Sequence, residues 1–318
     1  MSQSSLPLYA RILSAAVLAT AASSAQANQV WVSGHGSDAS GCGSTTSPCR
    51  SFQYAHDNII TPGGEIDVLD PADYGPVTIA KAISIVNDGV GTATIVQSAQ
   101  GMNAITVAAG ATDSVHLRGL SLDGLGVAAN GVSLSSAGQI DIVNCVVRRF
   151  ISHGIDLEPS TALNFTMTNV IAMEDANAGI NLRPAGNMVG AINGLTASYS
   201  VNGVQLMGDI SPASANIFVS VVRSVANSNG NGFAAFSASG HGYAKMALID
   251  STASGNGSGI YAGPNGQISV AHSSMVGNGS GADVAPSASI STMGDNNIYF
   301  NGTLMAGGGG SIGSYPPR

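Results

Sequence analysis

A glycine followed by alternating apolar and polar residues recurs along most of the chain. The glycines of successive copies lie 22 to 29 residues apart, from Gly131 to Gly281. The copies are NGVSL (130–134), HGIDL (153–157), AGINL (178–182), NGVQL (202–206), NGFAA (231–235), SGIYA (258–262) and SGADV (280–284). Such alternation is typical of β-strands, and a nearly constant period predicts a repeat architecture.

Each repeat also carries an apolar run upstream of its glycine, such as IDIVNCVV (140–147) or IFVSVVRSVA (217–226). Clusters of Asn, Gly and Ser, such as NSNGNG (227–232), separate these runs, and this is the chemistry of turns. The repeats leave no room for a helix. We therefore predict an all-β parallel β-helix of about eight to ten coils.

The alternation also predicts which side chains fill the core, because equivalent residues of stacked coils form ladders along the axis. The expected inward ladder comprises Ile105, Val132, Ile155, Ile180, Val204, Phe233 and Ile260. Asn144, Asn169, Asn193 and Asp250 fall at matching turns, which predicts a ladder of hydrogen-bonding side chains there.

Residues 28–62 lack the repeat and are expected to form an N-terminal cap, because the open end of a β-helix exposes strand edges and core. The pair Ser47-Pro48 predicts the start of a short helix that places Phe52, Ala55 and Ile59 on one face. The predicted organisation is a signal peptide (1–27), the cap (28–62), the β-helix (63–305) and a flexible C-terminal tail (306–318).

Charge and targeting signals narrow the partners and the compartment. The formal net charge is −8, which disfavours nucleic acid and anionic membranes as partners. Arg11, an apolar run (12–22) and Ala25-Gln26-Ala27 together indicate a secretory signal peptide, with an uncleaved anchor as the alternative. The protein is therefore expected to be secreted or periplasmic, with no membrane span in the mature chain.

The three cysteines fit that compartment. Cys42 and Cys49 close a small loop and are predicted to form a disulfide. Cys145 stands alone in an apolar run, which favours a buried small side chain over a nucleophile.

The N-terminal third resembles a known superfamily. The segments VSGHGSDASGCGSTTSPCRSFQYA (32–55) and GGEIDVLDPADYGPVTIAKAISIV (63–86) are similar to those of secreted bacterial β-helix proteins of the pectin-lyase-like superfamily. This resemblance implies a right-handed parallel β-helix, but the superfamily includes lyases, hydrolases, esterases and proteins without known activity.

The catalytic motifs of the superfamily's pectin enzymes are not present as sets. Gly-His-Gly occurs at 34–36 and 240–242 without partner carboxylates in the expected order. The histidines at 35, 56, 116, 241 and 272 show no ligand spacing, so we predict no metal and no cofactor.

One outward patch combines acidic, basic and amide side chains. Inward Ile and Leu residues force their neighbours outward on three successive repeats, which gives the candidate set Asp156, Glu158, Asn181, Arg183 and Gln205, with His153 beside it. Asp156 and Glu158 are two residues apart on a strand, or roughly 6.7 Å, a separation used by paired carboxylates in glycoside hydrolysis. An open sheet face removes little water, so neither carboxyl is expected to have a raised pKa.

Two functions remain open from the sequence. The first is a non-catalytic extracellular scaffold or weak glycan-binding surface, favoured by missing motifs, few aromatic residues and short loops. The alternative is a polysaccharide lyase or glycoside hydrolase acting on an acidic, uronate-containing polysaccharide. In that case Asp156, Glu158, Arg183 and His153 would be catalytic, and Asn181 and Gln205 would bind the ligand. The expected partner in either case is a polysaccharide or cell-surface glycan.

Overall fold

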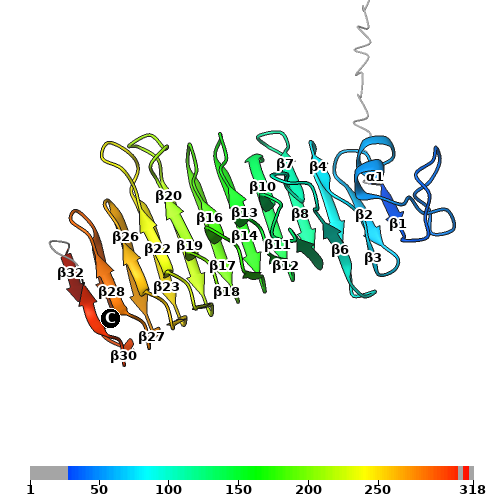
Figure 1. Cartoon of the computed structure of the whole chain (residues 1–318). Helices are drawn as coiled ribbons and strands as arrows, with labels where there is room; N and C mark the ends of the chain where they lie inside the picture. Colours follow the sequence, from blue (N-terminus) through cyan, green and yellow to red (C-terminus); the bar gives the residue numbers. More distant parts are fainter. Residues whose placement is uncertain (1–27, 307–310, 315–318) are drawn as a thin grey trace, which may run out of the picture.

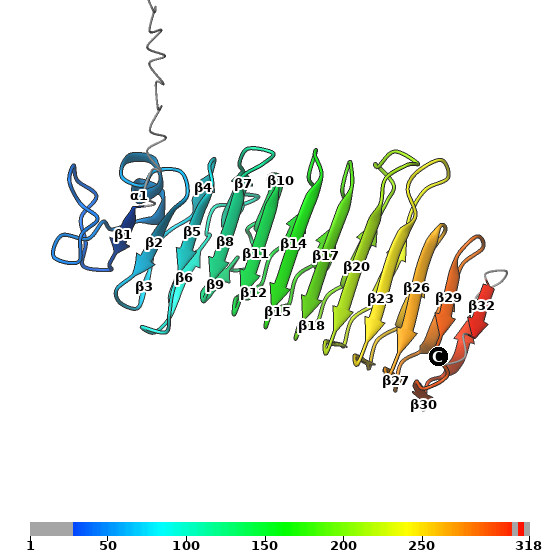
Figure 2. The same cartoon turned by 180° about the vertical axis from the view of Figure 1, so that it is seen from behind.

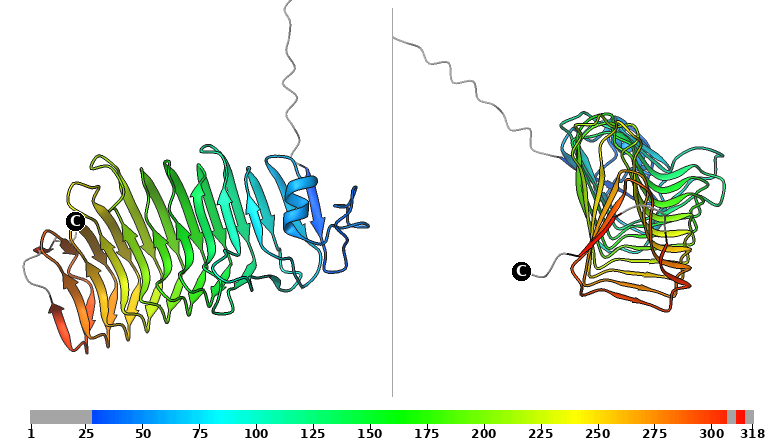
Figure 3. Two further views of the ribbon diagram at one scale, coloured as in Figure 1. Left: turned by 45° about the horizontal axis from the view of Figure 1, so that its top comes forward. Right: turned by 90° about the vertical axis from the view of Figure 1, so that its left-hand side faces the viewer.

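The chain winds into a parallel β-helix in which three sheets run along one axis (Figure 1). The computed structural model describes residues 28–306 and 311–314, and the predicted signal peptide (1–27) lies outside this range. Every ladder between neighbouring strands is parallel, and successive strands of one sheet come from successive coils. Figure 2 shows the opposite side of the stack, and Figure 3 shows the coils overlaid when seen along the axis. The predicted fold class, an all-β right-handed parallel β-helix, is confirmed.

Each coil contributes one strand to the first, then the second, then the third sheet. The first sheet contains β1 (Gln29–Val32), β2 (Gly64–Val68), β5 (Ile83–Val86), β8 (Ser114–Arg118), β11 (Gln139–Val143), β14 (Leu163–Thr168), β17 (Met188–Asn193), β20 (Ile217–Val222), β23 (Ala244–Ile249), β26 (Gly266–Ala271), β29 (Ser289–Thr292) and β32 (Ser311–Ser314). The second contains β3 (Ala72–Asp73), β6 (Ala93–Val96), β9 (Leu120–Asp123), β12 (Val146–Arg148), β15 (Ile171–Met173), β18 (Thr196–Ser198), β21 (Val225–Asn227), β24 (Thr252–Ser254), β27 (Ser274–Val276) and β30 (Asn297–Tyr299). The third contains β4 (Val77–Ile79), β7 (Ile105–Ala108), β10 (Asn130–Ser136), β13 (His153–Leu157), β16 (Ala178–Leu182), β19 (Asn202–Met207), β22 (Asn231–Phe236), β25 (Ser258–Ala262), β28 (Ser280–Val284) and β31 (Thr303–Ala306).

The core is a set of aliphatic ladders. The predicted inward ladder from Ile105 to Ile260 is confirmed, since its members pair in register across the third sheet and are at most 1% exposed. Leu134, Leu157, Leu182 and Leu206 form a second buried ladder beside it. Burying each of these side chains stabilises the folded state by about 1.5–3 kcal/mol. Many such residues together explain how a chain with few aromatic residues can be stable.

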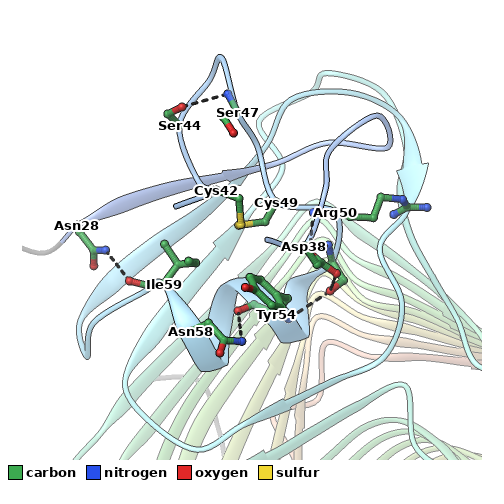
Figure 4. Close-up of a disulfide and its surroundings, with 11 residues drawn as sticks. Asn28, Asp38, Cys42, Ser44, Ser47, Cys49, Arg50, Tyr54, Asn58 and Ile59 are labelled. Carbon is green, nitrogen blue, oxygen red and sulfur yellow. Dashed lines mark hydrogen bonds between the residues drawn. A yellow bond between two sulfur atoms is a disulfide. The ribbon is translucent and has the colours of Figure 1, made fainter. Parts of the chain in front are cut away.

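The N-terminal cap covers the first coil with β1 and the helix α1 (Phe52–Asn58). Cys42 and Cys49 form a disulfide beside this helix (Figure 4). The predicted helix start at Ser47-Pro48 is wrong: Ser51 is the N-cap, and its Oγ accepts the Tyr54 N–H at 3.2 Å. The helix starts later because Cys49 is held extended, where its N–H donates to Trp31 and its carbonyl accepts from Ser33.

Two further expectations differ from the structure. Within the predicted flexible tail (306–318), Ser311–Ser314 forms β32, which pairs with β29 and extends the first sheet. In the predicted turn ladder, Asn169 donates to Asn144 at 3.2 Å, as expected. Asn193, however, pairs with Thr168 and is therefore one residue before the position equivalent to Asn169. Gly194 occupies the corresponding position, with φ of 72°, which suits a glycine.

A different polar ladder lies at the corner between the second and third sheets. Asn229, Asn256, Asn278 and Asn301 stack there on successive coils, and each side-chain oxygen accepts the backbone N–H of the equivalent residue one coil earlier, at 2.8–3.0 Å. We call these four residues the corner ladder. No helix in the described residues is both long and apolar enough to cross a membrane.

Candidate functional site

The candidate site lies on the outer face of the third sheet, where β13, β16 and β19 are neighbours. Asp156, Asn181 and Gln205 are paired in register on these strands, as their repeat positions predict. Their inward neighbours fix the outward direction, yet Asn181 is only 1% exposed and Gln205 only 8%. Buried amides of this kind need hydrogen-bond partners, and their partners define the site.

A directed chain of side-chain amides ends on Asp156. Asn231 donates to Asn202 at 2.8 Å, Asn202 to Gln205 at 2.7 Å, and Gln205 to Asn181 at 2.7 Å. Asn181 in turn donates to Oδ1 of Asp156 at 2.7 Å. We call the four amide residues, Asn231, Asn202, Gln205 and Asn181, the amide chain. Because hydrogen bonds in series polarise one another, each donor strengthens the next, and the last donor needs an acceptor.

The second half of the site is a charged cluster around Arg183. Its Nε and Nη2 donate to the two carboxylate oxygens of Asp209 at 2.9 and 2.8 Å, a bidentate pair. Its Nη1 lies 3.5 Å from Glu158, which also accepts a 3.3 Å bond from Asn181. Arg183 and Glu158 are 33% and 38% exposed, so this cluster meets solvent.

The electrostatics of the site differ from the expectation. Burial raises the pKa of Asp156 to about 6, with a further increase from Glu158, while Asn181 and Arg183 act in the opposite direction. The expectation that an open sheet face leaves Asp156 unshifted is therefore wrong. The amide chain and its neighbours cover this carboxyl more closely than a bare strand face would, and lost hydration disfavours its charge.

His153 is less suited to acid–base work than its position indicates. Burial lowers its pKa to about 4, so the imidazole is neutral at pH 7. Its Nδ1 is buried and, among the described residues, has no hydrogen-bond partner. His153 therefore brings no positive charge to the site.

The sequence missed part of the site. Asp209 lies in the connection after β19, outside the repeat, and only its bond to Arg183 identifies it. Asn202 and Asn231 begin the NGVQL and NGFAA copies, and the recurring Asn at that position was the available signal. The Arg183–Asp209 bond raises the pKa of Arg183 and lowers that of Asp209, so both stay charged.

Other candidates do not join this site. Cys145 is buried, and burial raises the pKa of its thiol to about 11, which is wrong for a nucleophile at neutral pH. His241 holds a loop, with its Nδ1 2.8 Å from the Ser211 carbonyl oxygen. In the residues described, no group of three or more His, Cys, Asp or Glu is arranged to hold a metal ion.

Comparison with known proteins gives likeness at the level of the fold. No protein-family model matches the chain, and no curated protein matches its sequence. The chain is similar to the A-module of the Azotobacter vinelandii mannuronan C-5 epimerase AlgE6, with a TM-score of 0.58 and 17% identity over 80% of this chain and 92% of that module. The chain is also similar to the A-module of the mannuronan C-5 epimerase AlgE4 from the same organism. The TM-score is 0.53, with 16% identity over 81% of this chain and 88% of that module. The fold implied by the resemblance to pectin-lyase-like β-helix proteins is thereby confirmed.

Proposed function

We propose that this protein is an enzyme that acts on a uronate-containing polysaccharide by elimination, with Asp156 as the group that removes a proton from the sugar. The observation that carries this proposal is the amide chain, which ends on a carboxyl whose pKa is about 6. A base with a pKa close to the working pH is both ionised and strong enough to take a proton. The fold likeness to modules named as mannuronan epimerases supports a polysaccharide substrate.

The geometry gives Asp156 one occupied and one free oxygen. Asn181 donates to Oδ1, and Oδ2 receives no hydrogen bond from any residue that the structure describes. The amide chain thus holds Oδ1 and leaves Oδ2 without a donor among the described residues, and Oδ2 is not one of the buried side-chain atoms that lack a partner. That oxygen is the proposed proton acceptor.

Arg183 supplies the complementary charge for a uronate carboxylate. Its Nε and Nη2 are fixed by Asp209, whereas Nη1 makes only the 3.5 Å contact with Glu158. A substrate carboxylate can replace Glu158 at this edge and form a charge-assisted bond there. Asp209 then acts as a positioning residue, because it holds the guanidinium rather than touching the sugar.

The proposed step balances as follows. Asp156 takes the proton from the sugar carbon that bears the carboxylate, and the electron pair of that C–H bond forms a carbon–carbon double bond. The glycosidic C–O bond at the adjacent carbon breaks, and the leaving oxygen takes a proton from water. Arg183 stabilises the negative charge that develops on the carboxylate during proton removal.

The test is a product assay with the purified protein on mannuronan and other polyuronates. Elimination gives unsaturated ends, which absorb in the ultraviolet, together with new reducing ends. Asp156→Asn should lower the formation of both by about 10²–10⁴-fold, while Asp283→Asn, which changes an outward carboxyl further along the same sheet, should leave them unchanged. Full activity of Asp156→Asn would refute the assignment of the base.

Hydrolysis is the second candidate, and the separation of Asp156 and Glu158 favours it. Asn181 Nδ2 donates to an oxygen of each carboxyl, at 2.7 and 3.3 Å, so these two oxygens are closer than the roughly 6.5–9.5 Å of inverting glycosidases and nearer the separation that retaining ones use. Asp156 would then be the acid and Glu158 the nucleophile. Reducing ends without unsaturation, and activity that falls rather than rises through about pH 6, would select hydrolysis over elimination.

A further inference from the structure

An apolar strip continues the row of outward side chains that begins at Arg183. Met207 and Phe236 occupy the equivalent positions on the next two coils, β19 and β22. The following position is Gly263, where an added Cβ would meet the Tyr261 ring at 3.0 Å and Cβ of Phe236 at 2.6 Å. The Tyr261 ring therefore lies over Gly263 and beside Phe236, with the two ring centroids 6.4 Å apart.

This strip is unusual because outward positions of a β-helix are ordinarily polar. Phe236 and Tyr261 are both half-buried. Phe236 lies two rungs and Tyr261 three rungs from Arg183, or about 10 and 14 Å along the axis. A polysaccharide that runs along the axis from Arg183 would pass over both rings.

We propose that Phe236 and Tyr261 form a subsite for a pyranose ring of the same polysaccharide, and this rests on the proposed function. One face of a pyranose presents mainly C–H groups, and these pack on the electron-rich face of an aromatic ring. Gly263 is required for this arrangement, because any side chain there would displace the Tyr261 ring. The subsite binds sugar without taking part in the chemistry.

The test measures binding of short and long mannuronan oligosaccharides to Tyr261→Ala. The expected result is about tenfold weaker binding of the long oligosaccharides, with little change for those too short to span from Arg183. The matched control is Phe218→Ala, which removes an aromatic that is 39% exposed on the first sheet and should have no effect. Unchanged binding by Tyr261→Ala, or wild-type protein that binds no oligosaccharide of any length, would overturn the subsite.

The outcomes separate the subsite from the catalytic proposal. Tyr261→Ala that binds normally while Asp156→Asn makes no product overturns the subsite alone. Tyr261→Ala that binds weakly while Asp156→Asn keeps full turnover overturns the assignment of Asp156 alone.

A second inference concerns Asp175, which occupies the corner position one coil before Ser200 and two before Asn229. Its Oδ1 accepts the Phe150 N–H at 3.1 Å, as Asn229 accepts the Ser200 N–H at 3.0 Å. Asp175 is 0% exposed, and its Oδ2 has no hydrogen-bond partner among the described residues. Asp175 thus occupies the corner position two coils before the corner ladder, separated from it by Ser200, with a carboxyl in place of an amide.

The second oxygen of Asp175 lies where the ladder has an amide nitrogen. A Cβ added at Gly154 would contact Oδ2 of Asp175. At the equivalent glycines of the ladder, Gly203 and Gly232, an added Cβ would instead contact an amide nitrogen, Nδ2 of Asn229 and of Asn256 respectively. In the ladder this nitrogen donates to the backbone carbonyl of the second sheet one coil earlier, at 2.8–3.1 Å. For Asp175 the equivalent carbonyl by register is that of Val147.

We propose that Asp175 is a protonated carboxylic acid in the folded protein, with its Oδ2–H donating to the Val147 carbonyl as the asparagine amides do. An ionised carboxylate would place two acceptor oxygens together without a donor, which is costly in a buried position. Loss of this proton at alkaline pH would loosen the corner beside Gly154, on the strand that carries Asp156.

The surroundings favour the neutral form. Burial raises the pKa of Asp175 to about 8, the Phe150 N–H acts in the opposite direction, and Glu174 adds to the increase. Glu174, Arg149 and Tyr199 line the same hollow of about 580 Å³ over this corner. The charge of Arg149 is bound by Asp123, and His153, next to Gly154, is neutral at pH 7, so neither compensates an ionised Asp175.

The test compares thermal stability across pH for wild type, Asp175→Asn and Asn256→Asp. The wild-type melting temperature should fall as pH rises towards 8. The melting temperature of Asp175→Asn should not show this decrease, and that of Asn256→Asp should decrease more steeply than that of the wild type. Carboxyl ¹³C NMR of the wild type gives a second readout, in which one aspartate should titrate near pH 8. Asp175→Asn that keeps the wild-type pH dependence, or wild-type protein in which no aspartate titrates above pH 7, would overturn the proposal.

Discussion

Two aspartates on neighbouring coils, Asp156 and Asp175, have opposite relations to the side-chain amides of the wall. Asp156 ends the amide chain, whereas Asp175 occupies the corner position two coils before Asn229. The amide chain on the outer face of the third sheet points its donors at Asp156. The corner ladder places an amide nitrogen, and therefore a donor, at the position equivalent to Asp175 Oδ2. An acceptor is needed at the first position and a donor at the second.

The same residue type is therefore suited to opposite protonation states. Asp156, with one oxygen that accepts no hydrogen bond from the described residues and a pKa of about 6, is ionised at neutral pH and suited to accept a proton. Asp175, enclosed and with a pKa of about 8, is suited to remain protonated and to stabilise the wall. A raised pKa alone does not identify a catalytic group, and the direction of the neighbouring hydrogen bonds decides between the two roles.

The largest expected effect is on activity at Asp156. Asp156→Asn should lower turnover of the polyuronate that the wild-type protein cleaves by about 10²–10⁴-fold, the usual contribution of a general base. Stability should be unchanged or slightly increased above pH 6, because the variant buries no charge. Unfolding by denaturant checks the second expectation, and a large loss of stability would mean that Asp156 is a structural residue like Asp175.

The corner ladder should show the reverse behaviour. Asn256→Ala removes an acceptor of the Asn229 N–H and a donor to the Ala226 carbonyl, both buried. The free energy of unfolding should fall by about 2–4 kcal/mol, because two or more buried polar groups lose their partners. Turnover at a temperature where the variant is folded should stay at the wild-type level, and a specific loss of turnover would contradict the separation of the two ladders.

The sequence predicted the fold well because each coil repeats one physical requirement. Inward Ile and Leu at a fixed spacing set both the register and the face of every strand, as the ladder from Ile105 to Ile260 confirms. The helix start was misplaced because the strand contacts of Cys49 override the local Ser-Pro signal. Tertiary contacts of this kind leave no periodic trace in a sequence.

The candidate site was only partly accessible from the sequence. The outward direction of Asp156, Asn181 and Arg183 follows from alternation, but Asp209 comes from a connection whose path no repeat specifies. The raised pKa of Asp156 depends on how closely neighbouring amides cover it, which the strand pattern alone does not set. The corner ladder lies in the NGNG and GNGSG turns, where the sequence shows turn chemistry but not which Asn faces inward.

A third prediction concerns pH and stability at Asp175. An unfolded aspartate loses its proton near pH 4, whereas folded Asp175 keeps it to about pH 8, so stability falls as pH rises between these values. The slope from this group should approach about 1.4 kcal/mol per pH unit. Urea unfolding at several pH values measures it, with Asp175→Asn as the reference, and equal slopes in the two proteins would contradict the protonated state.

The smallest effect is expected within the amide chain. Gln205→Ala removes the donor to Asn181 but leaves the Asn181–Asp156 bond in place. Turnover should fall only a few-fold, and the pKa seen in the pH–rate profile should move, because Asn181 is less polarised. Loss of activity without any change in the profile would indicate disrupted packing in place of an altered hydrogen bond.

The most direct test is a carboxyl ¹³C NMR titration of aspartate-labelled protein, with and without a mannuronan oligosaccharide. Two aspartates should titrate well above the normal range, near pH 6 and near pH 8, and disappear in Asp156→Asn and Asp175→Asn respectively. The oligosaccharide should shift the first titration and leave the second in place. A ligand that shifts the Asp175 titration, or that shifts neither, would contradict the division between a reactive and a structural carboxyl.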